Sequence, residues 1–193
     1  MAEARKKQGC RSCMVAFMDG DGNNFLAPEP IKDLEELQYQ YTYAEGNNYA
    51  DNVQNIYVRK PTGANITLTF SDIQSKLAAK MLGKKNKKGG TTTNTKDQPP
   101  RVAILFQETY SDGSYENKVF YNVKLSMDEN SAKTAGENID FTPKTVTGRA
   151  LPFSNETVDG DIDFTMDSAD PEIDKNKLDK FFEKVRFLDE EVS

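Results

Sequence analysis

Alternating apolar and polar residues predict that much of the chain forms antiparallel strands. In Leu34–Tyr43, large side chains recur at every second position, at Leu37, Tyr39, Tyr41 and Tyr43. This period of two places them on one face of a strand. The same alternation appears in Ile56–Arg59 and Asn65–Phe70, on either side of the turn-like sequence KPTGA. Because aromatic and β-branched residues suit a half-buried sheet, we expect three strands here.

A second run of alternation predicts a long hairpin in the middle of the chain. Arg101–Tyr110 and Tyr115–Met127 flank the sequence SDGS, in which Asp112 and Gly113 are a strong signal for a tight turn. Shorter segments of the same character predict further strands at Met14–Met18, Asn138–Thr142, Thr145–Phe153 and Asp161–Met166. The chain is therefore expected to be mainly β.

Two segments change to the helical period. The first follows Ser71, which suits the N-cap, and ends at Gly83, a typical residue just beyond a helix. Its apolar stripe consists of Ile73, Leu77, Ala78, Met81 and Leu82. The second begins with Asp170 as cap and Pro171 as first helical residue. Its stripe consists of Leu178, Phe181, Phe182 and Val185. Because short helices are marginal alone in water, both should pack on a sheet.

The composition is typical of one soluble domain. The 193 residues carry a formal net charge of −6, and the mean hydropathy is −0.73. A chain of this length can bury a self-sufficient core, so we expect a single domain over residues 1–193. No run approaches the roughly 20 apolar residues of a transmembrane helix. The first apolar run is too short for a signal sequence, because Asp19 interrupts it. We expect synthesis in a cytoplasm and no membrane partner.

The absence of histidine is the strongest argument against an enzyme. Without histidine, the chain lacks the usual general base near neutral pH and every Ser-His or Cys-His pair. Its 31 acidic residues guarantee that some carboxylates are neighbours, but no two are marked for different catalytic roles. We therefore predict no catalytic residue and no cofactor.

Cys10 and Cys13 form a single C-x-x-C motif. A structural zinc site needs four nitrogen or sulfur ligands, which this chain cannot supply alone. A redox-active motif belongs between a strand and a helix, whereas Met14–Met18 continues as a short apolar strand. We interpret the two cysteines as reduced, incidental thiols and predict no metal site in the chain. A metal shared between subunits stays open.

The stretch GKKNKKGGTTTNTKDQPP, from Gly83 to Pro100, is basic and has no apolar residue in its middle. It lacks an aromatic residue to stack on a base and an arginine for bidentate base contacts, which disfavours a nucleic-acid site. A polar loop of about seventeen residues is long for a compact domain, so it is either functional or simply solvated. By contrast, the segment from Glu156 to Ser193 holds 13 acidic and 5 basic residues.

The order of these elements resembles the major tail proteins, or tail tube subunits, of long-tailed bacteriophages (siphophages). The resemblance rests on the sequence YADN at Tyr49–Asn52, on the strand Gly63–Phe70 and on the helix that ends in Leu82 and Gly83. It continues more weakly through Arg101–Leu125, Ile139–Phe141 and Lys180–Val185. The CRSC sequence near the N-terminus and the acidic C-terminal segment are departures that the resemblance does not explain.

The resemblance implies a β-sandwich or barrel of two packed antiparallel sheets, with one flanking α-helix and a short C-terminal helix. It implies a structural virion protein that forms hexameric rings, stacked into the tube that conducts the genome into the bacterial host. The implied partners are further copies of the chain, the tape-measure protein, the tail terminator and the tail-tip proteins. DNA would pass without specific binding along a lumen of acidic or neutral polar groups. Pairing of the two long strands across subunits would remove their exposed edges.

On this interpretation, residues 84–100 are predicted to form an inter-subunit arm that docks on acidic residues of a neighbour, such as those after Glu156. The residues predicted to act in the arm are Lys84, Lys85, Lys87, Lys88, Lys96, Pro99 and Pro100. The alternative is a solvated loop with no partner.

Two other functions stay open. One is a tube protein of a contractile injection or secretion system. The other is a monomeric β-sandwich module that binds carbohydrate or a host-surface partner through an aromatic platform. The residues of that platform would be Tyr39, Tyr41, Tyr43 or Tyr110.

Overall fold

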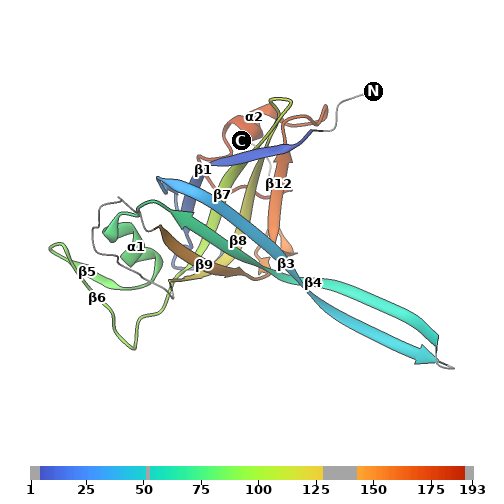
Figure 1. Cartoon of the computed structure of the whole chain (residues 1–193), viewed down its shortest axis with the longest axis horizontal. Helices are drawn as coiled ribbons and strands as arrows, with labels where there is room; N and C mark the ends of the chain where they lie inside the picture. The colour runs from blue at the N-terminus through green and yellow to red at the C-terminus, as the bar shows by residue number, and fades with distance from the viewer. Residues whose placement is uncertain (1–4, 51–52, 128–142, 190–193) are drawn as a thin grey trace, which may run out of the picture.

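The computed structural model describes residues 5–50, 53–127 and 143–189, and these ranges are mainly β, as the sequence predicts (Figure 1). The large sheet contains β1 (Lys7–Phe17), β2 (Glu29–Pro30), β3 (Leu34–Ala50), β4 (Val53–Phe70), β7 (Arg101–Tyr110), β8 (Tyr115–Ser126), β9 (Lys144–Ala150) and β12 (Asp163–Asp167). Two small antiparallel pairs are β5 (Lys85–Lys87) with β6 (Gly90–Thr92), and β10 (Phe153–Ser154) with β11 (Asp159–Asp161). The helices are α1 (Ser75–Met81) and α2 (Lys175–Asp179). Neither of these two described helices could span a membrane.

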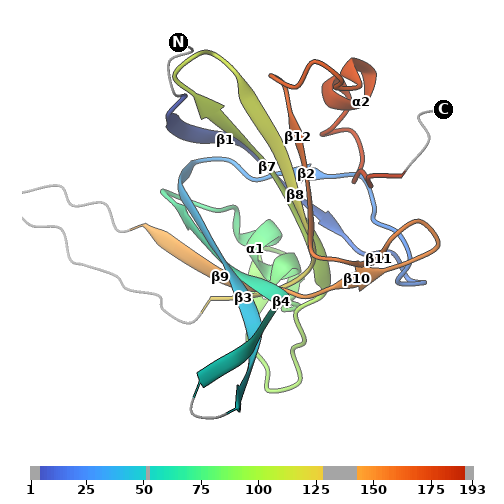
Figure 2. The same ribbon diagram turned by 90° about the vertical axis from the view of Figure 1, so that its right-hand side faces the viewer.

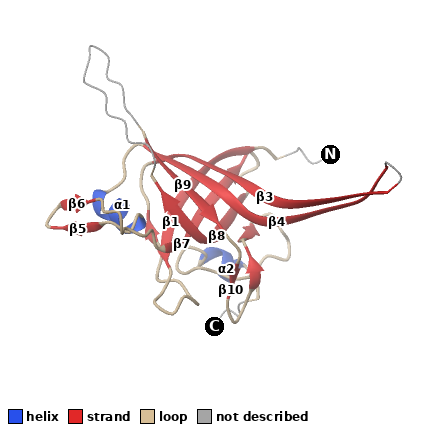
Figure 3. Ribbon diagram, turned by 90° about the horizontal axis from the view of Figure 1, so that it is seen from below, coloured by secondary structure: helices blue, strands red, loops and turns tan. Residues whose placement is uncertain are grey.

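The large sheet folds over on itself and so makes the two packed layers that the sequence predicts. Its strands run in the order β2-β1-β7-β8-β9-β4-β3, and β12 pairs with β8 outside this path. All of these pairs are antiparallel. Figure 3 shows β3, β4 and β9 crossing the direction of β1, β7 and β8. The two layers are therefore halves of one continuous sheet.

The sheet changes layers within β8, because this strand changes partners halfway. Residues 116–120 pair with β12, whereas residues 123–126 pair with β9. Between these two parts, Asn122 has a φ of 46°, a conformation that asparagine tolerates better than most residues. Its side-chain amide donates to the carbonyl of Pro152 at 2.9 Å, and its own carbonyl accepts from the backbone of Leu151. These contacts hold the kink that carries β8 from one layer into the other.

Two apolar clusters form because alternate residues of β7 and β8 point to opposite sides. The first cluster fills the space between the layers, and its largest fully buried side chains are Phe70, Phe106, Phe120, Ile66, Leu68, Met81, Ile104 and Leu125. The second lies between these strands and the C-terminal segment, and includes Leu105, Tyr121, Leu178, Phe181, Val185 and Phe187. Figures 1 and 2 both show α2 beside β12 on this side of the molecule.

β3 and β4 form one long hairpin, whereas the sequence analysis predicted separate strands at Ile56–Arg59 and Asn65–Phe70. β4 runs through KPTGA without a turn and stays paired with β3. Pro61 is tolerated there because a register shift lies beside it, and irregular positions do not need every ladder hydrogen bond. The outer part of the hairpin projects from the rest of the molecule (Figure 1).

β7 and β8 are central strands, so the expectation that they pair across subunits is wrong. β7 lies between β1 and β8, and β8 has β7 on one side and β12 or β9 on the other. The hairpin turn predicted between them is confirmed, because Gly113 has a φ of 84° and Asp112 accepts from the backbone of Ser114 at 3.0 Å. The long strand with an open edge is β3, which pairs only with β4 among the described strands.

α1 is shorter than predicted at its N-terminus. The hydroxyl of Ser71 donates to the Glu35 carboxylate and does not cap the helix, and no side chain caps α1. The predicted end is confirmed, because Gly83 has a φ of 66° and the backbone of Lys84 donates to the carbonyl of Ala79. The predicted apolar stripe is buried or packed against the first cluster.

α2 also starts later than predicted. Its cap is Asp174, which accepts from the backbone of Lys177 at 3.1 Å, while Asp170 accepts from Glu172 in a preceding turn. It also ends at Asp179, so the prediction that the helix continues through Phe181 and Val185 is wrong. Leu178, Phe181 and Val185 are nevertheless buried.

The remaining predicted strands differ mainly in their ends. Met14–Met18 lies mostly in the longer β1, and Asp161–Met166 corresponds to β12. Thr145–Phe153 is interrupted after Ala150, where β9 ends before β10 begins. Asn138–Thr142 lies outside the described residues.

We predict that Gly83→Ala destabilises the fold more than Gly89→Ala does. Both glycines have a left-handed φ, 66° and 81°, at which a Cβ costs about 1–2 kcal/mol. At Gly83 the Cβ would also overlap the carbonyl oxygen of Gln98, whereas at Gly89 it meets nothing within 4 Å. The backbone must move to relieve this overlap, so the free energy of unfolding should fall by at least about 1 kcal/mol more in Gly83→Ala. Denaturant unfolding measures both losses, and equal losses would contradict the prediction.

Candidate functional site

The outward side of β3, β4, β9 and the end of β8 is a polar sheet surface. Alternate residues of these strands fill the core, so the others point away from it. We call these residues the polar face: Glu36, Gln38, Gln40, Thr42, Asn65, Thr67, Thr69, Lys124, Ser126, Thr145, Thr147 and Arg149. All are exposed or half-buried. None of the large apolar side chains exposed in the described ranges belongs to the polar face. A broad surface of this kind offers hydroxyl and amide groups to a partner or to solvent.

Strand register aligns the polar face into cross-strand rows. One row consists of Gln38, Thr67, Thr147 and Ser126. Its last two hydroxyl oxygens lie 2.8 Å apart, so one hydroxyl donates to the other. The next row consists of Gln40, Asn65, Arg149 and Lys124, and it continues to Arg101 at the start of β7. The surface is thus neutral over most of its area and cationic toward β7.

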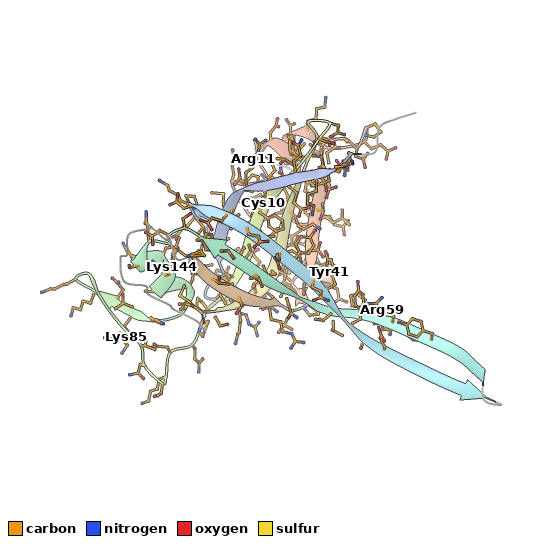
Figure 4. The ribbon with its side chains drawn as sticks, in the orientation of Figure 1. Cys10, Arg11, Tyr41, Arg59, Lys85 and Lys144 are labelled. Atoms are coloured by element: carbon orange, nitrogen blue, oxygen red, sulfur yellow. The ribbon has the colours of Figure 1, made fainter. Side chains whose placement is uncertain are left out.

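The projecting part of the β3–β4 hairpin exposes aromatic and apolar side chains. Tyr57 is 54% exposed, Val58 46% and Tyr43 41%. The guanidinium of Arg59 lies 3.8 Å from the centre of the Tyr43 ring and pairs with Glu45 at 3.2 Å, which stiffens one side of the hairpin. Figure 4 shows Arg59 on this projection. Exposed apolar groups on an extended element are typical of a surface that another molecule covers.

Residues 84–100 contain a small hairpin where the sequence predicted a loop. Lys88 and Gly89 form its two-residue turn, and both have a left-handed φ, 51° and 81°. Such a turn matches the twist of two paired strands, and glycine makes it accessible. Asn86 donates to the hydroxyl of Thr91 at 2.7 Å and adds a cross-strand bond. Figure 4 places Lys85 at the opposite end of the molecule from Arg59.

The lysines predicted to act in the arm are available for a partner. Four of them are exposed, at Lys85, Lys87, Lys88 and Lys96, while Lys84, Pro99 and Pro100 are half-buried. None of these ammonium groups pairs with an acid among the described residues. Exposed acids after Glu156 occur at Asp159, Asp170, Glu172, Asp174, Asp179, Glu183 and Asp189. Figure 1 shows α2 well apart from β5 and β6.

The four tyrosines considered as a binding platform do not share one exposed surface. Tyr39 packs between the layers, 5.2 Å from the ring of Phe120, and Tyr41 donates to Asp163 at 2.9 Å. Burial and the neighbouring Asp163 raise the pKa of Tyr41. Burial raises the pKa of Tyr110 to about 12, and the guanidinium of Arg5 covers its ring. Only Tyr43 remains largely exposed.

The two cysteines are ordinary thiols in β1. Cys13 is buried, and burial raises its pKa to about 12; burial also raises the pKa of Cys10. Ser12 between them has a φ of 56° and marks an irregularity in the strand. A raised pKa leaves little thiolate near neutral pH, so neither is an activated nucleophile. In the described ranges, no group of three or more metal-ligating side chains is placed to hold an ion.

Comparison with known proteins identifies a family. Residues 32–184 match the family model described as phage tail tube protein. No curated protein matches the sequence. One solved structure with a similar chain is the cryo-EM structure of the sheath–tube complex of an extracellular contractile injection system (PVC) in its extended state. The identity is 15%, over 80% of this chain and 88% of that chain, with a TM-score of 0.39.

Proposed function

The chain belongs to the phage tail tube protein family, and from this premise we propose that six copies close into a ring and that rings stack into the conduit for genome ejection. Proteins of this family are structural components of the phage tail and assemble into tubes. The single observation that most supports the proposal is the polar face, which adjoins the open edge of β3. We further propose synthesis in the bacterial cytoplasm, and the tape-measure, tail-terminator and tail-tip proteins as partners in the virion.

The polar face has the properties that a conduit wall needs. A wall must not hold DNA tightly, and the hydroxyl and amide groups of Thr67, Thr147 and Gln38 carry no net charge. Wide apolar patches would attract protein instead, and none of the exposed large apolar residues lies on this face in the described ranges. A continuous sheet also presents a smoother wall than loops do. We therefore propose that the polar face lines the lumen.

The open edge of β3 supports closure into a ring. An unpaired strand edge exposes backbone N–H and C=O groups and favours pairing with another chain. β3 is 17 residues long, so its edge is far longer than most exposed edges in monomers. Pairing of this edge with a strand of the next subunit would continue the sheet around the ring. Closure into a barrel would then remove the edge from every subunit.

The projecting hairpin supports contact between copies beyond the sheet. Tyr57 and Val58 lie far out on β4, on opposite faces of the hairpin, so a partner could cover both sides. Burial of such side chains is worth about 1.5–3 kcal/mol each when complete. We propose that the hairpin packs on another copy, in the same ring or the next one.

We predict that Tyr57→Ala/Val58→Ala weakens tube assembly without weakening the fold. Both side chains are already exposed in the subunit, so the free energy of unfolding should change by less than about 0.5 kcal/mol. Loss of two buried interface side chains should raise the protein concentration needed for tubes by about tenfold or more. Sedimentation and negative-stain electron microscopy over a concentration series measure this change.

The matched control for the hairpin is Leu26→Ala/Leu151→Ala, which removes exposed apolar groups elsewhere. This control should assemble like the unchanged chain. If the hairpin variant and the control assemble equally well, the hairpin has no role in assembly.

For residues 84–100, we propose an inter-subunit arm whose lysines meet exposed acids of another copy. The exposed ammonium groups and the acids of the α2 region support this pairing, which is complementary in charge. The β5–β6 hairpin holds Lys85 and Lys87 in a defined strand, so less conformational freedom is lost on docking than for a loop.

We predict that Lys85→Gln/Lys87→Gln/Lys88→Gln slows and weakens assembly at low ionic strength. The difference from the unchanged chain should shrink as salt rises, because salt screens the same contacts. Light scattering during assembly at several salt concentrations measures the effect. Lys32→Gln/Lys76→Gln/Lys175→Gln removes three other exposed lysines and should leave assembly unchanged. Normal assembly of the first variant would mean that residues 84–100 are a solvated surface segment.

A further inference from the structure

Three cations occupy directly opposed positions on three adjacent strands. Arg101 of β7 is the register partner of Lys124 of β8, which is the register partner of Arg149 of β9. All three side chains are exposed. We call them the cationic row. Adjacent strands lie about 4.8 Å apart, so the two outer residues are about 10 Å apart at the sheet surface.

This arrangement is unfavourable for the isolated subunit. Like charges directly opposite each other on neighbouring strands destabilise a sheet. No ion pair or hydrogen bond joins any of the three side chains to another residue in the described part of the chain. The chain as a whole is acidic, with a net charge of −6, so the row is not the result of a generally basic surface. A bound anion would relieve the repulsion.

We propose that the cationic row binds the phosphate backbone of duplex DNA, and that it makes the transient contacts between the tube wall and the genome. This inference rests on the proposed function, because it requires the polar face to line the lumen. Arginine matches phosphate with a planar pair of donors, and lysine adds a mobile point charge. Gln40 and Asn65 continue the same row with amide donors. Phosphate contacts of this kind position DNA without reading its sequence.

The surroundings of the row favour phosphate over an acidic protein partner. Cores of protein interfaces are enriched in aromatic and other apolar residues and depleted in charge. The neighbours of the row on the polar face are instead threonine, serine, asparagine and glutamine, at Thr147, Ser126, Asn65 and Gln40. Among the large exposed apolar residues, Tyr57 and Val58 belong to the outer part of β4, while Leu151 follows the end of β9, two positions after Arg149. A wet, neutral surface with one line of cations suits a polymer that slides.

The cationic row also changes how strongly the wall of the lumen attracts DNA. A purely neutral wall would exert no attraction, and a purely acidic wall would repel the duplex toward the axis. A few cations per subunit on a neutral surface give contacts that are weak, strongly salt-dependent and quickly exchanged. Such contacts would hold the duplex near the wall without stopping its movement.

The test compares duplex binding by the unchanged chain and by Arg101→Gln/Lys124→Gln/Arg149→Gln. Fluorescence anisotropy with a labelled duplex is measured over a range of KCl concentrations, below the protein concentration at which tubes form. Three phosphate contacts contribute a slope of about −2.7 to log K against log [salt]. The slope measured for the variant should be smaller by this contribution. The variant should also bind duplex at least tenfold more weakly at low salt. Lys32→Gln/Lys76→Gln/Lys175→Gln changes the net charge equally and should keep the slope.

The outcomes distinguish a failure of the inference about the cationic row from a failure of the proposed tube function. A variant that retains the slope, or an unchanged chain that does not bind duplex, overturns the inference. Competition by poly-glutamate as effective as that by DNA also overturns it, in favour of an acidic protein. Thermal unfolding of the variant should show equal or greater stability, because repulsion within the row is removed. Electron microscopy of the same proteins tests tube formation independently, so failure of the proposed function is recognised by missing tubes and not by missing DNA binding.

Discussion

The architecture depends on the kink at Asn122, where β8 leaves one layer and enters the other. The kink lets one strand pair first with β12 and then with β9. It also changes which residues point inward, since Phe120 and Val123 both belong to the first apolar cluster although they differ in parity. As a result, Lys124 and Ser126 point outward and join the polar residues of β9 and β4. The kink therefore adds the end of β8 to the polar face that β3, β4 and β9 form.

The two layers joined by the kink also carry different surfaces. On one side of β7 and β8, the C-terminal segment covers the sheet with Phe181 and Phe187 and leaves the acids of α2 at the surface. On the other side, the layer of β3, β4 and β9 keeps its outer surface free and its edge open. The acidic and the polar surfaces are therefore separated in space as well as in sequence. That separation suits a subunit that binds its own copies and also borders a passage.

Local patterns in the sequence predicted the strands but not their arrangement. Period two correctly placed β3, β7 and β8, and Gly83 correctly marked the end of α1, because these signals act over a few residues. The prediction of a turn at KPTGA was wrong because Pro61 lies beside a register shift, where proline is tolerated within a strand. The turn at Lys88 was missed because lysine rarely adopts a left-handed φ. The cationic row could not be predicted at all, because only long-range register aligns Arg101, Lys124 and Arg149.

The most direct test of the account is a helical cryo-EM reconstruction of tubes assembled from the purified chain, with seeds from a matching tail tip if needed. The account predicts six subunits per ring, with Thr67 and Thr147 facing the axis and the edge of β3 paired with the next subunit. Tubes with the polar face turned outward would contradict the assignment of the lumen. A chain that stays monomeric at every concentration, even with seeds, would contradict the tube itself.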